Sequence, residues 1–474
     1  MTNIRIGSLP VKVILAFAVA VTTTLGHGQT YTDLYNFGSA SGDPINPRGA
    51  VAQGFDGNLY STARGGTFGD GSIFDVTPLG TLSSLYSFSS TSQNADNGLT
   101  LGSDGNLYGT TIYGGGSTGC FGFGCGMLFR ITPDGMLTTL HNFSGHGDGT
   151  KLYGPPIQGA DSNFYGVTKS GGAHDVGTIY KLTPAGKLIT LYSFSKKPGH
   201  GYAPTAPLIQ GRDGNFYGTT SAGGKACCFG TVFKITPSGK FTSLYDFDST
   251  HGSQPLGALV EGSDGGFYGT TSHGGSHGGG VVFRITAYGK LAVLHNLSGP
   301  SDGRFPVTAL VLATDGKFYG VCQFGGVTGQ GTIFSVNPKN SYRFTVVYSF
   351  DGIDGAYPSA LMQHTNGTLY GVSVEGGTAR GCTSGCGTFF SLDMKIGPFV
   401  RLMSESGKAG QIIGIIGQGF RGTTGVSFNG KAAKFIVATD TYLTATVPKG
   451  VTNGFVIVAT PRGNLVSSQR FRVQ

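Results

Sequence analysis

Three aspartates, each followed by glycine, are the side chains of this sequence best placed to bind a ligand. They are Asp148, Asp302 and Asp354, and each lies in a link between two repeated segments. Carboxylates around the mouth of a channel can bind a cation or accept hydrogen bonds from sugar hydroxyls, so we predict that these three residues contact a ligand. The alternative is a plain turn, because Asp and Gly both favour turns. The spacing alone leaves both interpretations open.

Six of the seven cysteines form three local pairs in glycine-rich loops. The pairs are Cys120 with Cys125, Cys382 with Cys386, and the adjacent Cys227 and Cys228. In a secreted chain such pairs predict local disulfides. The adjacent pair is the least favourable, because neighbouring Cα atoms lie about 3.8 Å apart and a disulfide usually spans more. Zinc is the alternative, but it needs four convergent ligands and these pairs come from different repeats.

Patterns of known catalytic sites are missing from the sequence. No His-Glu-x-x-His, nucleophile-elbow, phosphate-loop or EF-hand pattern occurs, and the ten histidines stand mostly alone in loops. One position of each first strand is mostly an amide, which predicts either a polar channel ring or hydrogen bonds within the wall. It is occupied by Gln53, Leu101, Gln158, Gln210, Glu261, Leu312 and Gln363. With one charge in this ring, we predict no catalytic residue, no metal and no cofactor.

A segment of about 50 residues repeats seven times and must position these groups. Each copy is recognised by a turn of the Asp-Gly-Asn kind, followed by Leu-Tyr or Phe-Tyr and usually by Gly. The tyrosines are 48 to 57 residues apart, at Tyr60, Tyr108, Tyr165, Tyr217, Tyr268, Tyr319 and Tyr370. One unit predicts short strands at 208–210, 216–220, 231–235 and 241–247, because aromatic and β-branched runs lie between turn signals.

Four strands in each of seven units predict an all-β fold, a seven-bladed β-propeller spanning residues 30–396. The last repeat stops after its third strand, and residues 31–37 read as a lone fourth strand that would close the last blade. In such blades the glycine-rich loops and the links share one rim, here called the loop rim. The Asp-Gly and Pro-x-Gly turns share the other, the turn rim. Length varies only on the loop rim, where binding usually occurs.

The unit resembles the bacterial GloVer repeat, the Gloeobacter–Verrucomicrobia type, whose pattern runs DGNLYGTT, GG, GTVFKLTP, G and LYSF. The resemblance covers residues 31–393, with local departures at Ser162, which replaces a turn glycine, and Ala287, which replaces a turn proline. Proteins of this family are secreted or surface-located. The resemblance implies no shared biochemical activity.

Residues 397–474 lack the repeat and resemble an IPT/TIG domain, through the stretches 410–420, 426–430 and 454–458. The usual proline before the first Ser-Gly is absent, and Glu405 stands there. The resemblance implies an immunoglobulin-like β-sandwich that acts as a spacer or contact module. This segment holds nine Lys or Arg and two Asp or Glu, within a chain of net charge +8. Its basicity predicts contact with an anionic cell surface, and a solvated surface is the alternative.

Residues 1–29 read as a signal peptide, because Arg5 and Lys12 precede a short apolar run at 13–21. This run is about half of the roughly 20 residues that a membrane span requires. We expect a secreted or cell-surface protein, with the periplasm as the alternative. We also expect a monomer with no membrane span in the mature chain and no nucleic-acid partner.

These observations predict a secreted, non-catalytic binding or scaffold protein that recognises a glycan or another protein through the loop rim. A hydrolase or lyase acting on polysaccharide on the same scaffold is the alternative. A hydrolase would need two carboxylates facing one cleft, which the sequence does not reveal.

Overall fold

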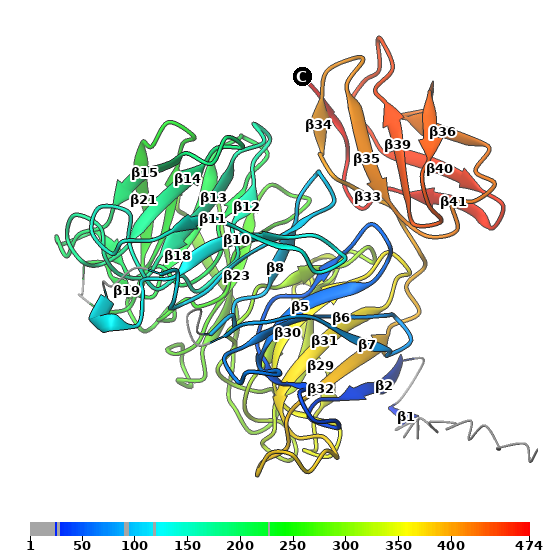
Figure 1. The fold of residues 1–474 in the computed structure, drawn as a ribbon. Coiled ribbons are helices and arrows are strands. Elements are labelled where there is room, and N and C mark those ends of the chain that lie inside the picture. Colours follow the sequence, from blue (N-terminus) through cyan, green and yellow to red (C-terminus); the bar gives the residue numbers. More distant parts are fainter. Residues whose placement is uncertain (1–23, 26–28, 90–93, 117–119, 226–227) are drawn as a thin grey trace, which may run out of the picture.

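The computed structural model describes residues 24–25, 29–89, 94–116, 120–225 and 228–474. It is an all-β structure, and its strands form small sheets, mostly antiparallel and mostly of four strands (Figure 1). The predicted signal peptide and Cys227 fall largely or wholly outside the described residues. No helix in the described part of the chain is long and apolar enough to cross a membrane.

Each repeat contributes one sheet in which the strands follow one another in chain order. The first contains β3 (Pro44–Pro47), β4 (Ala52–Gln53), β5 (Leu59–Gly65), β6 (Ser72–Val76) and β7 (Leu82–Ser87). The second contains β8 (Leu99–Leu101), β9 (Leu107–Thr110), β10 (Met127–Ile131) and β11 (Leu137–Asn142), with the 3-10 turn η1 (Cys120–Gly122) before β10. The third contains β12 (Ile157–Gln158), β13 (Phe164–Thr168), β14 (Thr178–Leu182) and β15 (Leu188–Ser193).

The next three sheets repeat this order. The fourth contains β17 (Ile209–Gln210), β18 (Phe216–Thr220), β20 (Thr231–Ile235) and β21 (Phe241–Asp246), beside the small pair β16 (Gly201–Tyr202) and β19 (Ala222–Gly223). The fifth contains β22 (Val260–Glu261), β23 (Phe267–Thr271), β24 (Val281–Ile285) and β25 (Leu291–Asn296). The sixth contains β26 (Val311–Leu312), β27 (Phe318–Cys322), β28 (Thr332–Asn337) and β29 (Arg343–Ser349), with η2 (Pro338–Asn340) before β29.

The seventh sheet joins the two ends of the repeat region. It contains β30 (Ala356–Gln363), β31 (Leu369–Glu375) and β32 (Thr388–Asp393) of the last repeat, followed by β2 (Gln29–Asn36) from the N-terminal end and β1 (Thr24–Leu25). β2 pairs antiparallel with β32, from Thr30 opposite Asp393 to Asn36 opposite Thr388. The N-terminal segment therefore supplies the fourth strand that the last repeat lacks.

The repeated tyrosine has two contacts that explain its recurrence. Its hydroxyl bonds the side chain of the turn residue four positions earlier, as in the 2.7 Å bond from Tyr217 to Asp213. In the second to fifth repeats its ring packs on the phenylalanine that opens the second strand of the following repeat, as Tyr217 does on Phe267 at 4.0 Å between centroids. The tyrosine thus fixes the local turn and joins neighbouring sheets.

The glycine after the tyrosine is required by the third strand. A Cβ atom added at Gly218 would lie 2.5 Å from Cζ of Phe233, the residue opposite it on β20. The same close approach recurs between Gly269 and Phe283. A large ring therefore fills the space over each glycine. The recurrence of Tyr-Gly on the second strand and of Phe opposite it on the third strand follows from packing inside one sheet.

The core lies between successive sheets. Tyr60, Ile73 and Phe88 of the first repeat pack with Leu107 and Phe129 of the second, and equivalent clusters recur at the following junctions. One cluster combines the first repeat with the last, through residues such as Phe74 and Phe389. Hydrophobic burial therefore acts mainly between neighbouring repeats.

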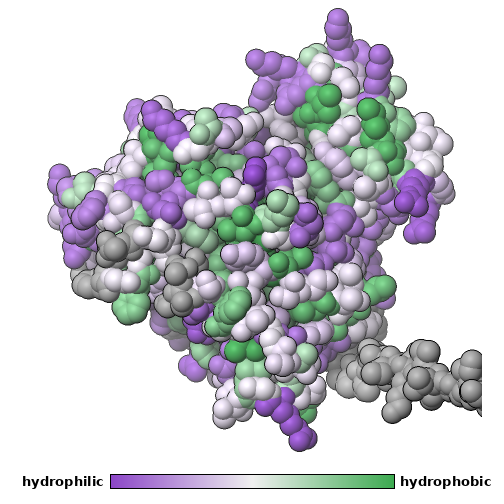
Figure 2. Space-filling view, in the orientation of Figure 1, coloured by the Kyte–Doolittle hydropathy of each residue, from purple (hydrophilic) through white to green (hydrophobic). Residues whose placement is uncertain are grey.

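The C-terminal residues fold as a separate β-sandwich (Figure 1). One sheet contains β33 (Arg401–Leu402), β35 (Ile412–Ile416), β39 (Tyr442–Thr446) and β38 (Phe435–Val437), and the other contains β37 (Lys431–Ala433), β36 (Gly425–Phe428), β40 (Val456–Thr460) and β41 (Gly463–Val466). A short parallel pair links β34 (Ser406–Gly407) to β42 (Arg472–Val473). The side chains of the two sheets share one apolar core. Hydrophilic residues gather at the outer tips of this domain (Figure 2).

This domain packs on the turn rim of the repeats. Phe55, in the turn after β4, stacks on Tyr442 with 3.8 Å between ring centroids, and its carbonyl accepts a hydrogen bond from Thr441 Oγ1 at 2.6 Å. Farther along the rim, Arg472 Nη1 donates to the carbonyl of Arg212 at 2.5 Å. These contacts leave the loop rim as the face of the repeat region that the domain does not cover.

Candidate functional site

A cavity of about 740 Å³ opens on the loop rim, between the loops of the second and third repeats. It combines aromatic, hydroxyl and charged side chains with bare glycine backbone. Its lining comprises Tyr113, Cys120, Phe123, Gly145, Thr150, Lys151, Ser170, Gly171 and Asp175. A concave surface with aromatic walls and a few polar groups is the usual form of a small-ligand site.

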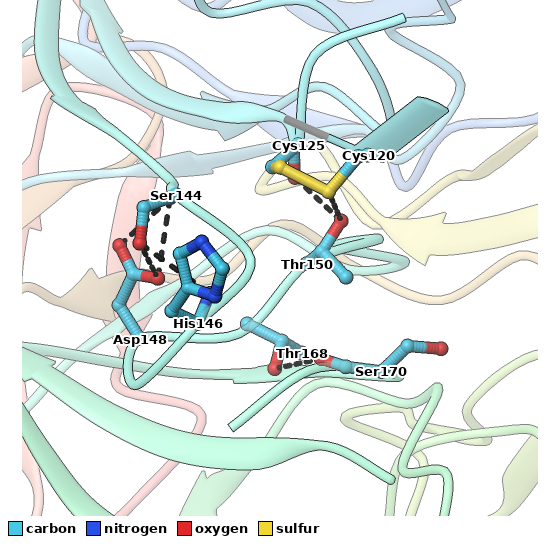
Figure 3. Close-up of a disulfide and its surroundings, with 8 residues drawn as sticks. All are labelled: Cys120, Cys125, Ser144, His146, Asp148, Thr150, Thr168 and Ser170. Atoms are coloured by element: carbon cyan, nitrogen blue, oxygen red, sulfur yellow. Dashed lines mark hydrogen bonds between the residues drawn. A yellow bond between two sulfur atoms is a disulfide. The ribbon is translucent and has the colours of Figure 1, made fainter. Parts of the chain in front are cut away.

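A disulfide shapes one wall of the cavity. Cys120 and Cys125 are bonded, and the hydroxyl of Thr150 donates to the carbonyl of Cys125 at 3.0 Å (Figure 3). Phe123, inside the loop closed by this bond, is 59% exposed. The sequence prediction of this disulfide is confirmed, as is that of Cys382 with Cys386. The predicted pair Cys227 and Cys228 stays a prediction, because Cys227 lies outside the described residues.

Two of the three predicted ligand-binding aspartates accept hydrogen bonds from residues of their own loops. Asp148 accepts hydrogen bonds from the backbone and hydroxyl of Ser144 (Figure 3). It also lies 3.1 Å from Nε2 of His141. Burial opposes ionisation here, but these hydrogen bonds prevail and lower the pKa of Asp148 to about 2. Asp302 makes the same set of contacts with Ser298 and His295. The structure does not bring these carboxylates together.

The third aspartate lies at the seam between the last two repeats. Tyr348 donates its hydroxyl to Oδ2 of Asp354, and the backbone N–H of Asp351 donates to Oδ1 at 2.9 Å. Burial raises the pKa of Asp354 to about 6. Burial also raises the pKa of Asp33 on β2 to about 6, with a smaller contribution from the negative charge of Asp354. Ligand contact by Asp148, Asp302 and Asp354 stays a prediction, while their turn-forming bonds are observed.

Each link between repeats contains, at an equivalent position, a non-glycine residue in the left-handed region, which such residues rarely adopt. These residues are Asn46, Asn94, Lys151, Ala203, Gln254, Phe305 and Tyr357, with φ between 48° and 63°. Each backbone N–H donates to a loop carbonyl of the preceding repeat, as from Lys151 to Cys125 and from Ala203 to Val176. The loop rim therefore carries a series of equivalent positions, at which the backbone conformation and hydrogen bond recur while the side chain varies.

The polar position of the first strands links neighbouring repeats on the turn rim. Gln158 Oε1 accepts from the N–H of Ser103 at 2.8 Å, and Glu261 Oε2 accepts from the N–H of Arg212 at 2.9 Å. Equivalent bonds are made by Gln53, Gln210 and Gln363. Of the two sequence interpretations, hydrogen bonding within the wall describes these residues.

A second cavity, of about 900 Å³, lies between the turn rim and the C-terminal domain. Arg212 and Arg472 line it together with Glu405 and several amides. Arg212 also lies 3.9 Å from Glu261 and donates to Gln469 at 3.1 Å. Charges of both signs are therefore present in this cavity. Among the described residues, no group of three or more His, Cys, Asp or Glu side chains is placed to hold a metal ion.

Apart from Cys120, the residues that line the cavity beside the disulfide are not marked by any pattern in the sequence. Tyr113, Phe123 and Lys151 lie in loops whose lengths and residues differ between repeats, so no pattern marks them. The available signal was the departure of one repeat from the others. Lys151 stands where another link has Ala203, and Lys169 stands where other repeats have Ser221 and Ser272.

Comparisons with known proteins match this architecture. Residues 19–145, 117–312 and 260–433 match the model of the Gloeobacter/Verrucomicrobia repeat, and residues 398–472 match the IPT/TIG domain. Both matches confirm the resemblances drawn from the sequence. The comparison with curated proteins found no match.

Solved structures resemble this chain at low sequence identity. A fungal alcohol oxidase of the AA5 family, in complex with copper, is 15% identical with a TM-score of 0.54, and the match covers 94% of this chain and 99% of that chain. A gluconolactonase of Xanthomonas campestris is 12% identical with a TM-score of 0.39, covering 76% and 98%. A putative 6-phosphogluconolactonase of Bacteroides uniformis is 16% identical with a TM-score of 0.44, covering 66% and 88%. The likeness to the oxidase, at 15% identity, concerns the fold alone.

Proposed function

The chain belongs to the Gloeobacter/Verrucomicrobia repeat family and carries an IPT/TIG domain after its repeats, and from this premise we propose that it is a secreted, non-catalytic protein that binds carbohydrate. The binding face is the loop rim of a closed seven-bladed propeller. The cavity beside the Cys120–Cys125 disulfide is the binding site. The C-terminal domain closes the turn rim.

Three observations support the closed seven-bladed propeller. Seven sheets of four or five strands follow one another in the repeat region, and core clusters join neighbouring sheets. The last repeat packs on the first through a shared core cluster, and β2 completes the last sheet. The match to the fungal oxidase covers 94% of the chain, so it includes the C-terminal domain as well as the repeats. Closure would also remove the unpaired strand edges of an open array.

The cavity on the loop rim carries the proposal of carbohydrate binding. Tyr113 and Phe123 lie 6.4 Å apart between ring centroids, at an angle of 61°. Aromatic faces pack against the C–H faces of sugar rings, while hydroxyl, ammonium and carboxylate groups meet the sugar hydroxyls. Thr150, Lys151, Ser170 and Asp175 supply such groups in the same lining. A protein partner is the other occupant of this rim, and the experiment below separates the two.

The two disulfides and the signal-like N-terminal residues support secretion, because disulfides persist in oxidising compartments. A non-catalytic role is supported by the carboxylates of the cavity. Asp175 is the carboxylate among the lining residues, whereas a glycoside hydrolase of the usual kind needs a pair flanking the scissile bond. Asp148 is committed to its loop by three hydrogen bonds. A hydrolase or lyase remains the alternative function.

A glycan-array screen of the folded protein tests the proposal, with mass spectrometry of every bound glycan to detect cleavage. We expect binding without product, and a loss of affinity of about 5- to 10-fold for Tyr113→Ala and for Phe123→Ala. Tyr288→Ala is the matched control, because Tyr288 is 96% exposed in a turn of the opposite rim. Cleavage of a bound glycan would overturn the non-catalytic role. Absence of any glycan binding would favour a protein partner.

A further inference from the structure

Lys151, which lines the cavity, is joined through its backbone to Lys169, the residue before the lining residue Ser170. Lys151 belongs to the link before the third repeat and Lys169 directly follows β13, and the backbone N–H of Lys169 donates to the carbonyl of Lys151 at 3.0 Å. Thr150 and Ser170, their neighbours, form an antiparallel bridge. Both lysines are partly buried. Burial and the like charge of Lys151 together lower the pKa of Lys169. Two partly buried lysines thus extend from adjoining backbone, where solvent screens the repulsion between their charges incompletely.

Nearby carboxylates do not neutralise this pair. No Asp or Glu of the described residues lies within ion-pair distance of Lys151 or Lys169. Asp148 is bonded to His141 and Ser144, and Asp96 pairs with Arg64 at 2.7 Å. Asp175, which lines the cavity, is exposed. The lysine pair thus retains positive charge in a repeat region that is close to neutral as a whole.

Aromatic rings accompany the two cations. Nζ of Lys169 lies 4.8 Å from the centroid of the Tyr153 ring, and Lys151 shares the cavity with Tyr113 and Phe123. A polymer of acidic sugars offers the complementary groups, because each ring has a C–H face for the aromatics and an anion for an ammonium group. An acidic peptide would supply the anions without the rings.

We propose that the carbohydrate bound on the loop rim is an acidic polysaccharide, whose carboxylate or sulfate groups are bound by Lys151 and Lys169 while its sugar rings contact Tyr113 and Phe123. This inference rests on the proposed function and specifies its ligand class. Ammonium groups are strong point-charge donors to such anions. Binding would relieve the repulsion between the two lysines, so the pair favours an anionic ligand over a neutral one of the same shape.

The test compares an acidic oligosaccharide with its neutral ester and with a second acidic oligosaccharide that carries sulfate. Isothermal titration calorimetry would use an oligogalacturonate, its fully methyl-esterified form and a sulfated galactan oligosaccharide of similar length. We expect the acidic ligands to bind at least about tenfold more tightly than the ester, with an affinity that falls as salt rises. The uronate and the sulfated ligand distinguish which anion is preferred, and preference for either one supports the inference.

The variants come from other repeats of the same chain, so each residue is one that the position accepts. Lys151→Ala copies Ala203, which has φ of 55° against 59° for Lys151, and Lys169→Ser copies Ser221 and Ser272. We expect each to weaken the acidic ligands about tenfold and leave the methyl ester unchanged. Lys187→Ala with Lys240→Ala is the control, since both are exposed in turns of the other rim.

The outcomes separate the two proposals. Equal binding of the ester and the acid would overturn the acidic ligand but keep carbohydrate binding. Unchanged affinity in both lysine variants would overturn the assigned site. Polyglutamate that binds as tightly as oligogalacturonate would overturn the role of the sugar rings. If array hits are confined to neutral glycans, the proposed function stands and this inference fails.

Discussion

Tyr180 is a tyrosine at a position where the other repeats carry phenylalanine, and replacing it should stabilise the protein. The equivalent residues are Phe74, Phe129, Phe233, Phe283, Phe334 and Phe390. Tyr180 is fully buried, and its hydroxyl has no hydrogen-bond partner among the described residues. The hydroxyl lies over Gly166, where an added Cβ would be 2.3 Å away from it. The third repeat therefore buries a hydroxyl oxygen that is absent from the equivalent phenylalanines of the other repeats.

The size of the effect follows from this environment. A buried polar group without a partner costs about 1–3 kcal/mol, and burial accordingly raises the pKa of Tyr180. Removing one oxygen atom leaves a small void, which costs about 0.3 kcal/mol. We therefore expect Tyr180→Phe to stabilise the fold by about 1–2 kcal/mol. For a domain of this size, that corresponds to an increase of about 1–3 °C in Tm.

Differential scanning calorimetry of the wild type and Tyr180→Phe would measure this change. Phe233→Tyr is the matched control, because Phe233 is equally buried over Gly218 and would acquire an unpaired hydroxyl, with an expected loss of similar size. A lower Tm for Tyr180→Phe would refute the reasoning, since it would mean that the hydroxyl has a favourable partner in the folded protein.

Three other changes test separate features of the structure. Burial raises the pKa of Asp33 from 3.8 to about 6, so between these values the folded chain binds more protons than the unfolded one and its stability falls as pH rises. Asp33→Asn should therefore remove this decline, which raises the free energy of unfolding by about 2–3 kcal/mol at pH 7 and leaves it unchanged at pH 4. Thermal unfolding measured from pH 4 to pH 7 would show the change, and a pH profile equal to that of the wild type would contradict the prediction. Loss of the Cys120–Cys125 bond in Cys120→Ser should cost about 2 kcal/mol and weaken glycan binding, whereas Cys382→Ser should affect stability alone, as measured by calorimetry and titration. Phe55→Ala removes the stack on Tyr442 and should weaken domain docking by about 1–2 kcal/mol, seen as faster proteolysis between the two domains; an unchanged cleavage rate would argue against the stack as an anchor.

Structural features that depend on contacts inside one repeat, such as strands and local disulfides, could be predicted from the sequence. The second and third strands expected at 216–220 and 231–235 coincide with β18 and β20. The Cys120–Cys125 and Cys382–Cys386 disulfides close loops of a few residues. Turn type, strand alternation and short loop closure all depend on residues close in the chain, so the pattern of residue types is sufficient for them.

The candidate site depends on contacts between repeats, which the pattern does not encode. Tyr113 and Ser170 line one cavity although they belong to loops of different repeats. Likewise, nothing in the spacing shows that the carboxylate of Asp148 is occupied by Ser144 and His141 and is therefore less available to a ligand.

The sequence by itself determined the period, the strands, the local disulfides and the two kinds of domain, because these follow from backbone preferences and from side chains a few residues apart. Only the tertiary structure decided where the C-terminal domain docks and which loops form the cavity. It also decided that Lys151 and Lys169 meet without a counter-charge. Such features arise from competition among groups that are distant in the chain, and only the packed structure shows which partner each group obtains.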